Sequence, residues 1–270
     1  MSALFVPDGD ALVPTDLARG PWDPNALHGG PTSALLARAI ESCPTDGVAF
    51  EVARLTVELL RPVPVEPLLV EAVVARPGRK VQLAEATIRH AATGTEVARA
   101  RALRIRSAPV TLPDDPVVAL EPPPEPGPAA SRPEVSKLAD DYVAFHNAGV
   151  EHRFAAGTWL EVGPVTVWIR LLAPVVEGEE PSPLQRVAAA ADFGNGVSRV
   201  LSWETHVFIN PELTVHLLRP AESPWICLDA RTLIGGAGIG MAESALYDER
   251  GRIGGAAQSL IVDARPPLAG

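Results

Sequence analysis

Hydrophobic and polar residues alternate along several stretches of the chain, with the period of two that half-buried strands require. In LTVELLRP (55–62), Leu55, Val57 and Leu59 share one face of such a strand, and the residues between them share the other. Nearly the same eight residues, LTVHLLRP, return at 213–220, 158 positions further along the chain. The pattern therefore predicts two equivalent strands in two halves of the chain.

The likeness between the two halves continues beyond this strand. RPGRKVQLAEATI (76–88) aligns with IGGAGIGMAESAL (234–246) at the same offset, and one deletion then aligns ATGTEVARARALRI (92–105) with ERGRIGGAAQSLIV (249–262). Each half accordingly predicts a strand, a turn, a long strand, a tight glycine turn and another long strand. The turn sequences PGR, ATG and ERG contain glycine or proline, which supply the positive or fixed φ angles that turns need.

A helix is predicted before each block of strands. In the first half, Pro31–Ser42 has proline at an early helical position and apolar residues spaced near the helical period. In the second half, Pro183–Glu204 has a similar pattern, but DFGNG at 192–196 predicts a break or a kink. A repeat of this length indicates a duplicated domain and not a solenoid.

The segment between the halves differs in composition from both. Residues 107–133 are rich in proline and acidic residues, which predicts an extended linker that crosses the surface. We therefore expect an N-terminal unit at 1–106, this linker, and a C-terminal unit at 134–270. The predicted fold class is α+β, with two helix-plus-antiparallel-sheet units fused so that the chain forms its own dimer.

Composition and charge exclude several classes of protein. A formal net charge of −10 argues against a nucleic-acid partner and against docking on anionic membranes, since both require a basic surface. Apolar residues make up 47% of the chain, yet no uninterrupted run is long enough for a transmembrane helix. The start, MSALFVPDGDALVP, lacks the basic and apolar regions of a signal peptide. We therefore expect a soluble cytoplasmic protein with no membrane insertion.

The order and spacing of five short stretches resemble the acyl-CoA thioesterase II (TesB-like) family of double hot-dog proteins. This resemblance implies a tandem double hot-dog fold and the hydrolysis of acyl-CoA thioesters to free acid and CoA. The linker alone lies outside it. The stretches are HGGPTSALLARAIE (28–41), VTVWIRLLAPV (165–175), LQRVAAAAD (184–192), LTVHLLRP (213–220) and AAQSLIV (256–262).

The resemblance also implies three catalytic residues, Asp192, Thr214 and Gln258, with the aspartate activating a water that the other two hold and orient. Two stretches depart from the family pattern. The family strand carries Asp-His and Trp-Phe-His near the hydroxyl residue, where this chain reads ELTVHLLRP. In the first half, HGGP stands where the family has a phenylalanine, two glycines and a glutamine.

Each of these three residues also has a structural interpretation. Asp192 follows four alanines, so burial could raise the pKa of a general base, but an aspartate there could equally cap a helix. Thr214 has a counterpart, Thr56, in a half without an evident aspartate partner, and threonine favours strands in general. Gln258 corresponds to Arg101, so a strand does not require glutamine there, although it could be an exposed edge residue.

The stretch before the first helix is the main candidate for substrate binding. Gly29 and Gly30 permit a close backbone approach, and the free N–H groups of a helix N-terminus could form an oxyanion site. His28 could act beside them or cap the loop. Trp22 could close one wall of an acyl pocket or pack on the surface. His216 shares a strand face with Thr214 and could line the pocket or serve in packing.

The sequence implies no cofactor and no metal. GGAGIG (235–240) does not fit the dinucleotide-binding pattern, no G-x-S-x-G occurs, and the six histidines lack metal-ligand spacing. Arg61 and Arg219 could contact the phosphates of CoA or form salt bridges at strand ends. The expected partners are an acyl-CoA substrate and, as an implication of the family, further copies of the chain.

Two other functions stay open at this stage. The first is a hot-dog hydratase or dehydratase that acts on enoyl or hydroxyacyl thioesters, in which His28 would pair with a carboxylate. The second is a non-catalytic scaffold that binds acyl-thioesters.

Overall fold

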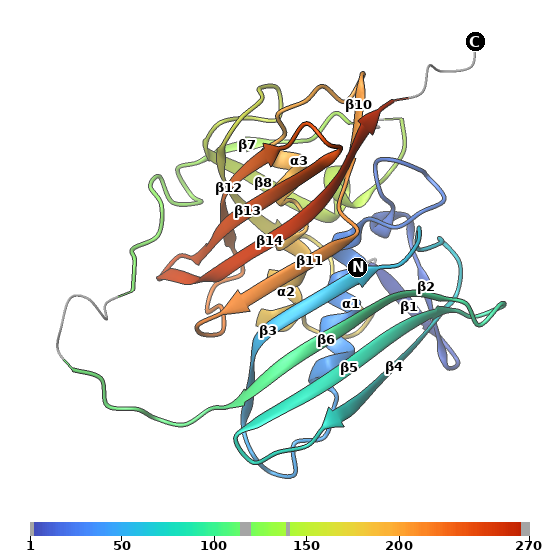
Figure 1. Ribbon diagram of the computed structural model, residues 1–270, viewed down its shortest axis with the longest axis vertical. Coiled ribbons are helices and arrows are strands. Elements are labelled where there is room, and N and C mark those ends of the chain that lie inside the picture. Colours follow the sequence, from blue (N-terminus) through green and yellow to red (C-terminus); the bar gives the residue numbers. More distant parts are fainter. Residues whose placement is uncertain (1–2, 114–119, 139–140, 266–270) are drawn as a thin grey trace.

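The computed structural model describes residues 3–113, 120–138 and 141–265 of the chain. Fourteen strands of these residues form one antiparallel sheet, and the two longest helices, α1 and α2, lie on the same side of it (Figure 1). The order along the sheet is β1-β2-β4-β5-β6-β3-β11-β14-β13-β12-β9-β8-β7, with β10 paired to β14. The predicted fold class, two helix-plus-antiparallel-sheet units in tandem, is confirmed.

The N-terminal half contributes one helix and six strands to this arrangement. Its helix, α1 (Gly29–Glu41), begins at the predicted glycine pair and two residues before the expected proline. A short 3₁₀ turn, Asp16–Ala18, precedes it. The strands are β1 (Phe5–Asp8), β2 (Ala11–Pro14), β3 (Phe50–Leu59), β4 (Leu68–Arg76), β5 (Val81–His90) and β6 (Glu96–Arg106).

The C-terminal half repeats the plan with a broken helix. The helix α2 (Pro183–Ala191) ends where DFGNG begins, and a short helix, α3 (Gly194–Val197), follows, so the predicted interruption is confirmed. A π-helical turn, Phe145–Gly149, precedes β8. The strands are β7 (Arg132–Glu134), β8 (Val150–Ala156), β9 (Val165–Leu171), β10 (His206–Ile209), β11 (Glu212–Leu217), β12 (Ile226–Ile234), β13 (Ile239–Asp248) and β14 (Gly251–Ala264).

The two copies of the repeated strand lie side by side at the centre of the sheet. They pair antiparallel as β3 and β11, with Thr56 opposite Thr214 and Val57 opposite Leu213. The alternating pattern decides which side chains enter the core, because Leu55, Val57, Leu213 and Val215 are all buried beneath the helices. The internal repeat therefore joins the halves into a pseudo-dimer, as the sequence predicts.

The second part of the predicted linker is held against the outer face of the C-terminal sheet. The indole N–H of Trp168 donates to the carbonyl oxygen of Pro126 over 3.1 Å, and the Tyr247 hydroxyl lies 3.0 Å from a carboxylate oxygen of Glu121. Residues 114–119, also in the predicted linker, lie outside the described residues. The predicted unit boundaries stay a prediction; β6 ends at Arg106 and β7 begins at Arg132. None of the helices in the described ranges is long and apolar enough to cross a bilayer.

Candidate active site

The first turn of α1 meets the last turn of α2, and the predicted glycines allow the helices to touch there. A Cβ atom at Gly30 would lie 2.7 Å from the carbonyl oxygen of Ala189, closer than such atoms approach. A Cβ atom at Gly29 would lie 2.6 Å from both carboxylate oxygens of Asp192. The Asp192 carboxylate therefore rests directly against the backbone that begins α1, where the helix dipole favours negative charge.

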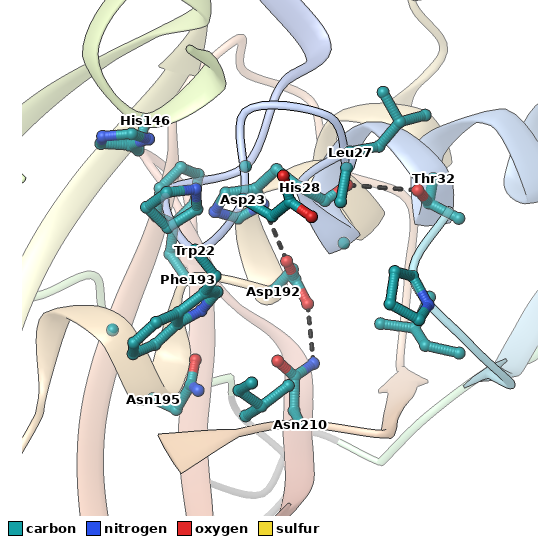
Figure 2. A pocket seen from close by; sticks show the side chains of 18 of the residues that line it. Trp22, Asp23, Leu27, His28, Thr32, His146, Asp192, Phe193, Asn195 and Asn210 are labelled. Atoms are coloured by element: carbon teal, nitrogen blue, oxygen red, sulfur yellow. Dashed lines mark hydrogen bonds and ion pairs between the residues drawn. The ribbon is translucent and has the colours of Figure 1, made fainter. Parts of the chain in front are cut away.

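Asp192 is the C-cap residue of α2, but its side chain does not cap that helix. One carboxylate oxygen, Oδ2, lies 2.9 Å from Nδ1 of His28, and the other, Oδ1, accepts a hydrogen bond of 2.8 Å from Nδ2 of Asn210 (Figure 2). The residue is 4% exposed. A buried carboxylate with two donors aimed at it is well fixed in position, which suits a general base.

His28 connects this carboxylate to the start of α1. It is the N-cap residue, and its Nδ1 atom lies 3.0 Å from the backbone N–H of Gly30 as well as 2.9 Å from Asp192. One ring nitrogen cannot donate to a carboxylate and accept from an N–H group at the same time. When Nδ1 carries its proton and donates to Asp192, the N–H of Gly30 is released from the histidine.

Asn210 is a site residue that the sequence analysis missed. It lies between β10 and β11, where Pro211 prevents the two from pairing with β14 as one regular strand. The available signal was the dipeptide Asn210-Pro211 inside an otherwise strand-like pattern, which indicates an irregular backbone.

The structure does not bring Thr214 and His216 together with Asp192. Leu213 and Val215 face the helices, and the period of two therefore turns Thr214 and His216 to the outer face of the sheet. There they line an open trough of about 600 Å³. The Thr214 hydroxyl lies 3.3 Å from that of Thr56, its repeat counterpart.

Gln258 does lie next to Asp192, and it is not at a sheet edge, because β14 runs between β11 and β13. The residue is 2% exposed. Its Nε2 donates to the backbone carbonyl of Asp192 over 3.2 Å and lies 3.5 Å from Oδ1, while its Oε1 accepts from the backbone N–H of Asn195 over 3.0 Å. Gln258 thus holds the turn that carries Asp192 and does not line the cavity described next.

Asp192 and His28 lie on a cavity of about 360 Å³ with mostly apolar walls. Three of its aromatic walls, Trp22, Trp159 and Trp203, come from segments far apart in the sequence. Trp22 packs against Trp203 with ring centroids 5.0 Å apart. Of the two positions that the sequence left open for Trp22, the structure places it in the lining of this cavity.

Two further histidines are buried beside the cavity and stay neutral. Burial lowers the pKa of His146 to about 4, and a nearby charge on His28 would lower it further, although a hydrogen bond to the Leu138 carbonyl opposes this. Burial lowers the pKa of His152 to about 3, with smaller effects from His146 and His28. The ring centroid of Phe193 lies 4.8 Å from that of His152 and 4.8 Å from that of His28.

The two candidate phosphate-binding arginines have different surroundings. Arg219 donates to both carboxylate oxygens of Asp248, over 2.7 and 2.6 Å, so it forms the salt bridge at a strand end that the sequence analysis left open. Arg61 is exposed and lines the cavity.

Comparison with known structures finds the same fold at low sequence identity. A candidate thioesterase II from Thermobifida fusca YX has a TM-score of 0.70 at 20% identity, covering 95% of each chain. A hot-dog-fold protein from Alicyclobacillus acidocaldarius has a TM-score of 0.69 at 18% identity, covering 98% of this chain and 96% of its own. The acyl-CoA thioesterase II TesB2 of Mycobacterium marinum has a TM-score of 0.64 at 14% identity, covering 97% and 96%. No curated protein matches the sequence.

Two family models match the sequence itself. The acyl-CoA thioesterase N-terminal domain matches residues 18–105, and the acyl-CoA thioesterase C-terminal domain matches residues 113–262. Because the second match alone spans more than half of the chain, the chain belongs to the acyl-CoA thioesterase family and is an enzyme of the thioester hydrolase class.

Proposed function

We propose that the enzyme hydrolyses acyl-CoA thioesters to a free acid and CoA, with Asp192 activating the attacking water. The observation that carries this proposal is the Asp192 carboxylate itself. It is buried, is held by Asn210 and His28 over 2.8 and 2.9 Å, and lies on the lining of a mostly apolar cavity of about 360 Å³. An apolar cavity suits an acyl chain, and a fixed carboxylate in its lining suits proton transfer from water.

In the proposed reaction, Asp192 takes a proton from water while the water oxygen attacks the thioester carbonyl carbon. The carbonyl oxygen becomes an oxyanion, which the N–H groups of Gly29 and Gly30 at the start of α1, beside Asp192, could stabilise. The carbon–sulfur bond then breaks, CoA leaves as a thiolate, and the proton held by Asp192 passes to the thiolate or to solvent.

His28 has a double role in this scheme. Its Nδ1–H donates to the ionised Asp192, which orients the carboxylate and frees the N–H of Gly30 for the oxyanion. Gln258 is a positioning residue, because it contacts the backbone of Asp192 and of Asn195 and does not line the cavity.

One observation favours a second candidate function. The contact of 2.9 Å between His28 and Asp192 is a carboxylate–histidine pair of the kind that a thioester hydratase or dehydratase uses to move protons. Such an enzyme would form an unsaturated or hydroxylated thioester and release no thiol.

The products distinguish the two candidates. We would incubate the purified protein with short, medium and long saturated acyl-CoAs, and separately with enoyl- and 3-hydroxyacyl-CoAs, and follow both free thiol and thioester composition. Thiol release with equimolar free acid is the expected result. Interconversion of the enoyl and hydroxyacyl thioesters without free thiol would replace hydrolysis with the second candidate.

A further inference from the structure

The internal repeat places an arginine followed by a proline at the end of both central strands, and the two arginines have unequal partners. In the C-terminal half, Arg219 donates to both carboxylate oxygens of Asp248, a residue with no exposed surface, and to the carbonyl oxygen of Gly251. This arginine is fully used within the fold, and its guanidinium is not available to a ligand.

The N-terminal half lacks the matching carboxylate. At the repeat offset, His90 stands where Asp248 stands in the other half, and its ring nitrogens contact Glu66 and Thr93, each over 2.9 Å. Arg61 consequently has no ion pair and no side-chain hydrogen bond within the residues that the structure describes. The fold holds the Arg219 guanidinium in a bidentate salt bridge, but it leaves the guanidinium of the exposed Arg61 without such a partner. The fold itself therefore does not require Arg61.

Arg61 also lies at a particular place, on the lining of the cavity that contains Asp192. Among the described lining residues it is the one lysine or arginine. Asp23, the exposed acidic residue on the same lining, accepts a hydrogen bond of 2.8 Å from the backbone N–H of Asn25. A second guanidinium, that of Arg265, lies 5.9 Å from the ring centroid of Trp22, which also lines the cavity. Two guanidinium groups, those of Arg61 and Arg265, therefore lie on or next to the exposed part of the lining, the mouth of the cavity, together with one exposed carboxylate, that of Asp23.

We infer that Arg61 binds a phosphate of the thiol carrier and so makes the enzyme selective for phosphorylated pantetheine thioesters over phosphate-free ones. The inference rests on the proposed function, because it assumes that the thioester carbonyl lies at Asp192 with the acyl chain in the cavity. The carrier then leaves through the mouth, past Arg61. A guanidinium forms two parallel hydrogen bonds to a phosphate, and it is always charged at physiological pH.

The test compares thioesters that share one acyl group and differ in the carrier, namely acyl-CoA, acyl-4′-phosphopantetheine and acyl-pantetheine. For Arg61→Gln we expect the KM for acyl-CoA to rise about tenfold, since charge-assisted hydrogen bonds are worth about 1.5–3 kcal/mol and this one is partly exposed to solvent. The kcat for all three thioesters and the KM for acyl-pantetheine should stay at the wild-type values. An equal rise for acyl-CoA and acyl-pantetheine, or no rise for either, would overturn the inference.

Arg106→Gln is the matched control, because Arg106 is also exposed and lies opposite Phe50, at the other end of β3 from Arg61. It removes the same charge and should leave every KM unchanged. A rise of KM for acyl-CoA in both variants would mean that net charge and not a contact is responsible, and would also overturn the inference. If Arg61→Gln affects acyl-4′-phosphopantetheine as much as acyl-CoA, the contact is with the pantetheine phosphate; if it affects acyl-CoA alone, the contact is with the nucleotide phosphates.

A binding measurement separates this inference from the proposed function. Titration of the wild type with free CoA, followed by calorimetry, needs no turnover. Weaker CoA binding to Arg61→Gln, with unchanged binding to Arg106→Gln, would support the phosphate contact even if no thioester were hydrolysed. CoA that binds all three proteins equally would overturn it.

Discussion

The helices α1 and α2 pack antiparallel, so the start of each helix meets the end of the other at two junctions. The internal repeat relates these two junctions, but their residues differ. At the first junction, Asp192 at the end of α2 lies 2.9 Å from His28 at the start of α1. At the second junction, Glu41 at the end of α1 accepts hydrogen bonds of 2.8 and 3.1 Å from Ser182 and Gln185 at the start of α2.

Each junction thus pairs a carboxylate with the N-terminus of the other helix, but their surroundings differ. Asp192 is buried against Gly29 and lies on the cavity. Glu41 is exposed, and the ion pair of Arg38 with Glu179 lies beside it. The comparison teaches that duplication supplied two similar carboxylate positions, and that glycines, burial and a cavity turned one of them into a candidate site.

The largest expected effect is a loss of folding stability in acid, because two histidines near the first junction, His146 and His152, are buried. His146 and His152 have pKa values of about 4 and about 3, below the unfolded value of about 6.5, so the unfolded chain binds more protons as the pH falls below 6.5. Their stabilisation is complete above pH 6.5 and is lost as the pH falls toward 4. Protonation linked to His146 alone should lower the free energy of unfolding by about 3 kcal/mol over that range.

Urea unfolding between pH 7 and pH 4 checks this expectation. In His152→Phe the free energy of unfolding should fall less steeply with acid than in the wild type. Equal slopes in the two proteins would show that the buried histidine does not control acid stability.

A smaller effect is expected at the contact between the helix backbone and the carboxylate. In Gly29→Ala the new Cβ atom would lie 2.6 Å from both carboxylate oxygens of Asp192, so the side chain must move away from its donors. Because the displaced carboxylate loses hydrogen bonds in a buried site, we expect a lower thermal stability together with a kcat about 100-fold lower. Gly236→Ala, where a Cβ atom meets nothing within 4 Å, is the control. A fully active Gly29→Ala enzyme would argue against the position of Asp192 as the critical feature.

Gln258 and its repeat counterpart Arg101 offer a matched comparison of the two halves. Gln258→Leu leaves the buried N–H of Asn195 without its acceptor, which should lower the free energy of unfolding by about 1–3 kcal/mol and reduce kcat as well. Arg101 is exposed and pairs with Glu85 on the sheet surface, so Arg101→Gln should cost less than about 1 kcal/mol and leave kcat unchanged. Equal costs in chemical unfolding would mean that Gln258 has no special positioning role.

The smallest effect is expected for the paired threonines of the central strands. Thr56 and Thr214 lie opposite each other with Oγ1 atoms 3.3 Å apart, away from the cavity. Thr56→Val and Thr214→Val should each change stability by less than about 1 kcal/mol and leave thiol release at the wild-type rate. Loss of activity in Thr214→Val alone would restore the catalytic role that the structure does not support.

The sequence predicts most of the fold because strand alternation and the repeat are local patterns. LTVELLRP and LTVHLLRP indicate equivalent strands, and DFGNG indicates the break after α2. The strand period also placed Thr214 and His216 on one face, but the period cannot say which face meets the core. Asn210 was missed because the irregular backbone before Pro211 directs its side chain to Asp192. The path of that backbone depends on how β10 and β11 pair with β14, which a local pattern does not reveal.

The most direct test measures both junctions in one assay of thiol release from acyl-CoA. Asp192→Asn and Glu41→Gln remove the same charge from equivalent ends of the helix pair and change side-chain size very little. We predict that Asp192→Asn lowers kcat at least ~100-fold, as expected for the loss of a general base, and that Glu41→Gln keeps the wild-type kcat. Retained activity in Asp192→Asn, or an equal loss in Glu41→Gln, would contradict the assignment of the active site to the His28–Asp192 junction.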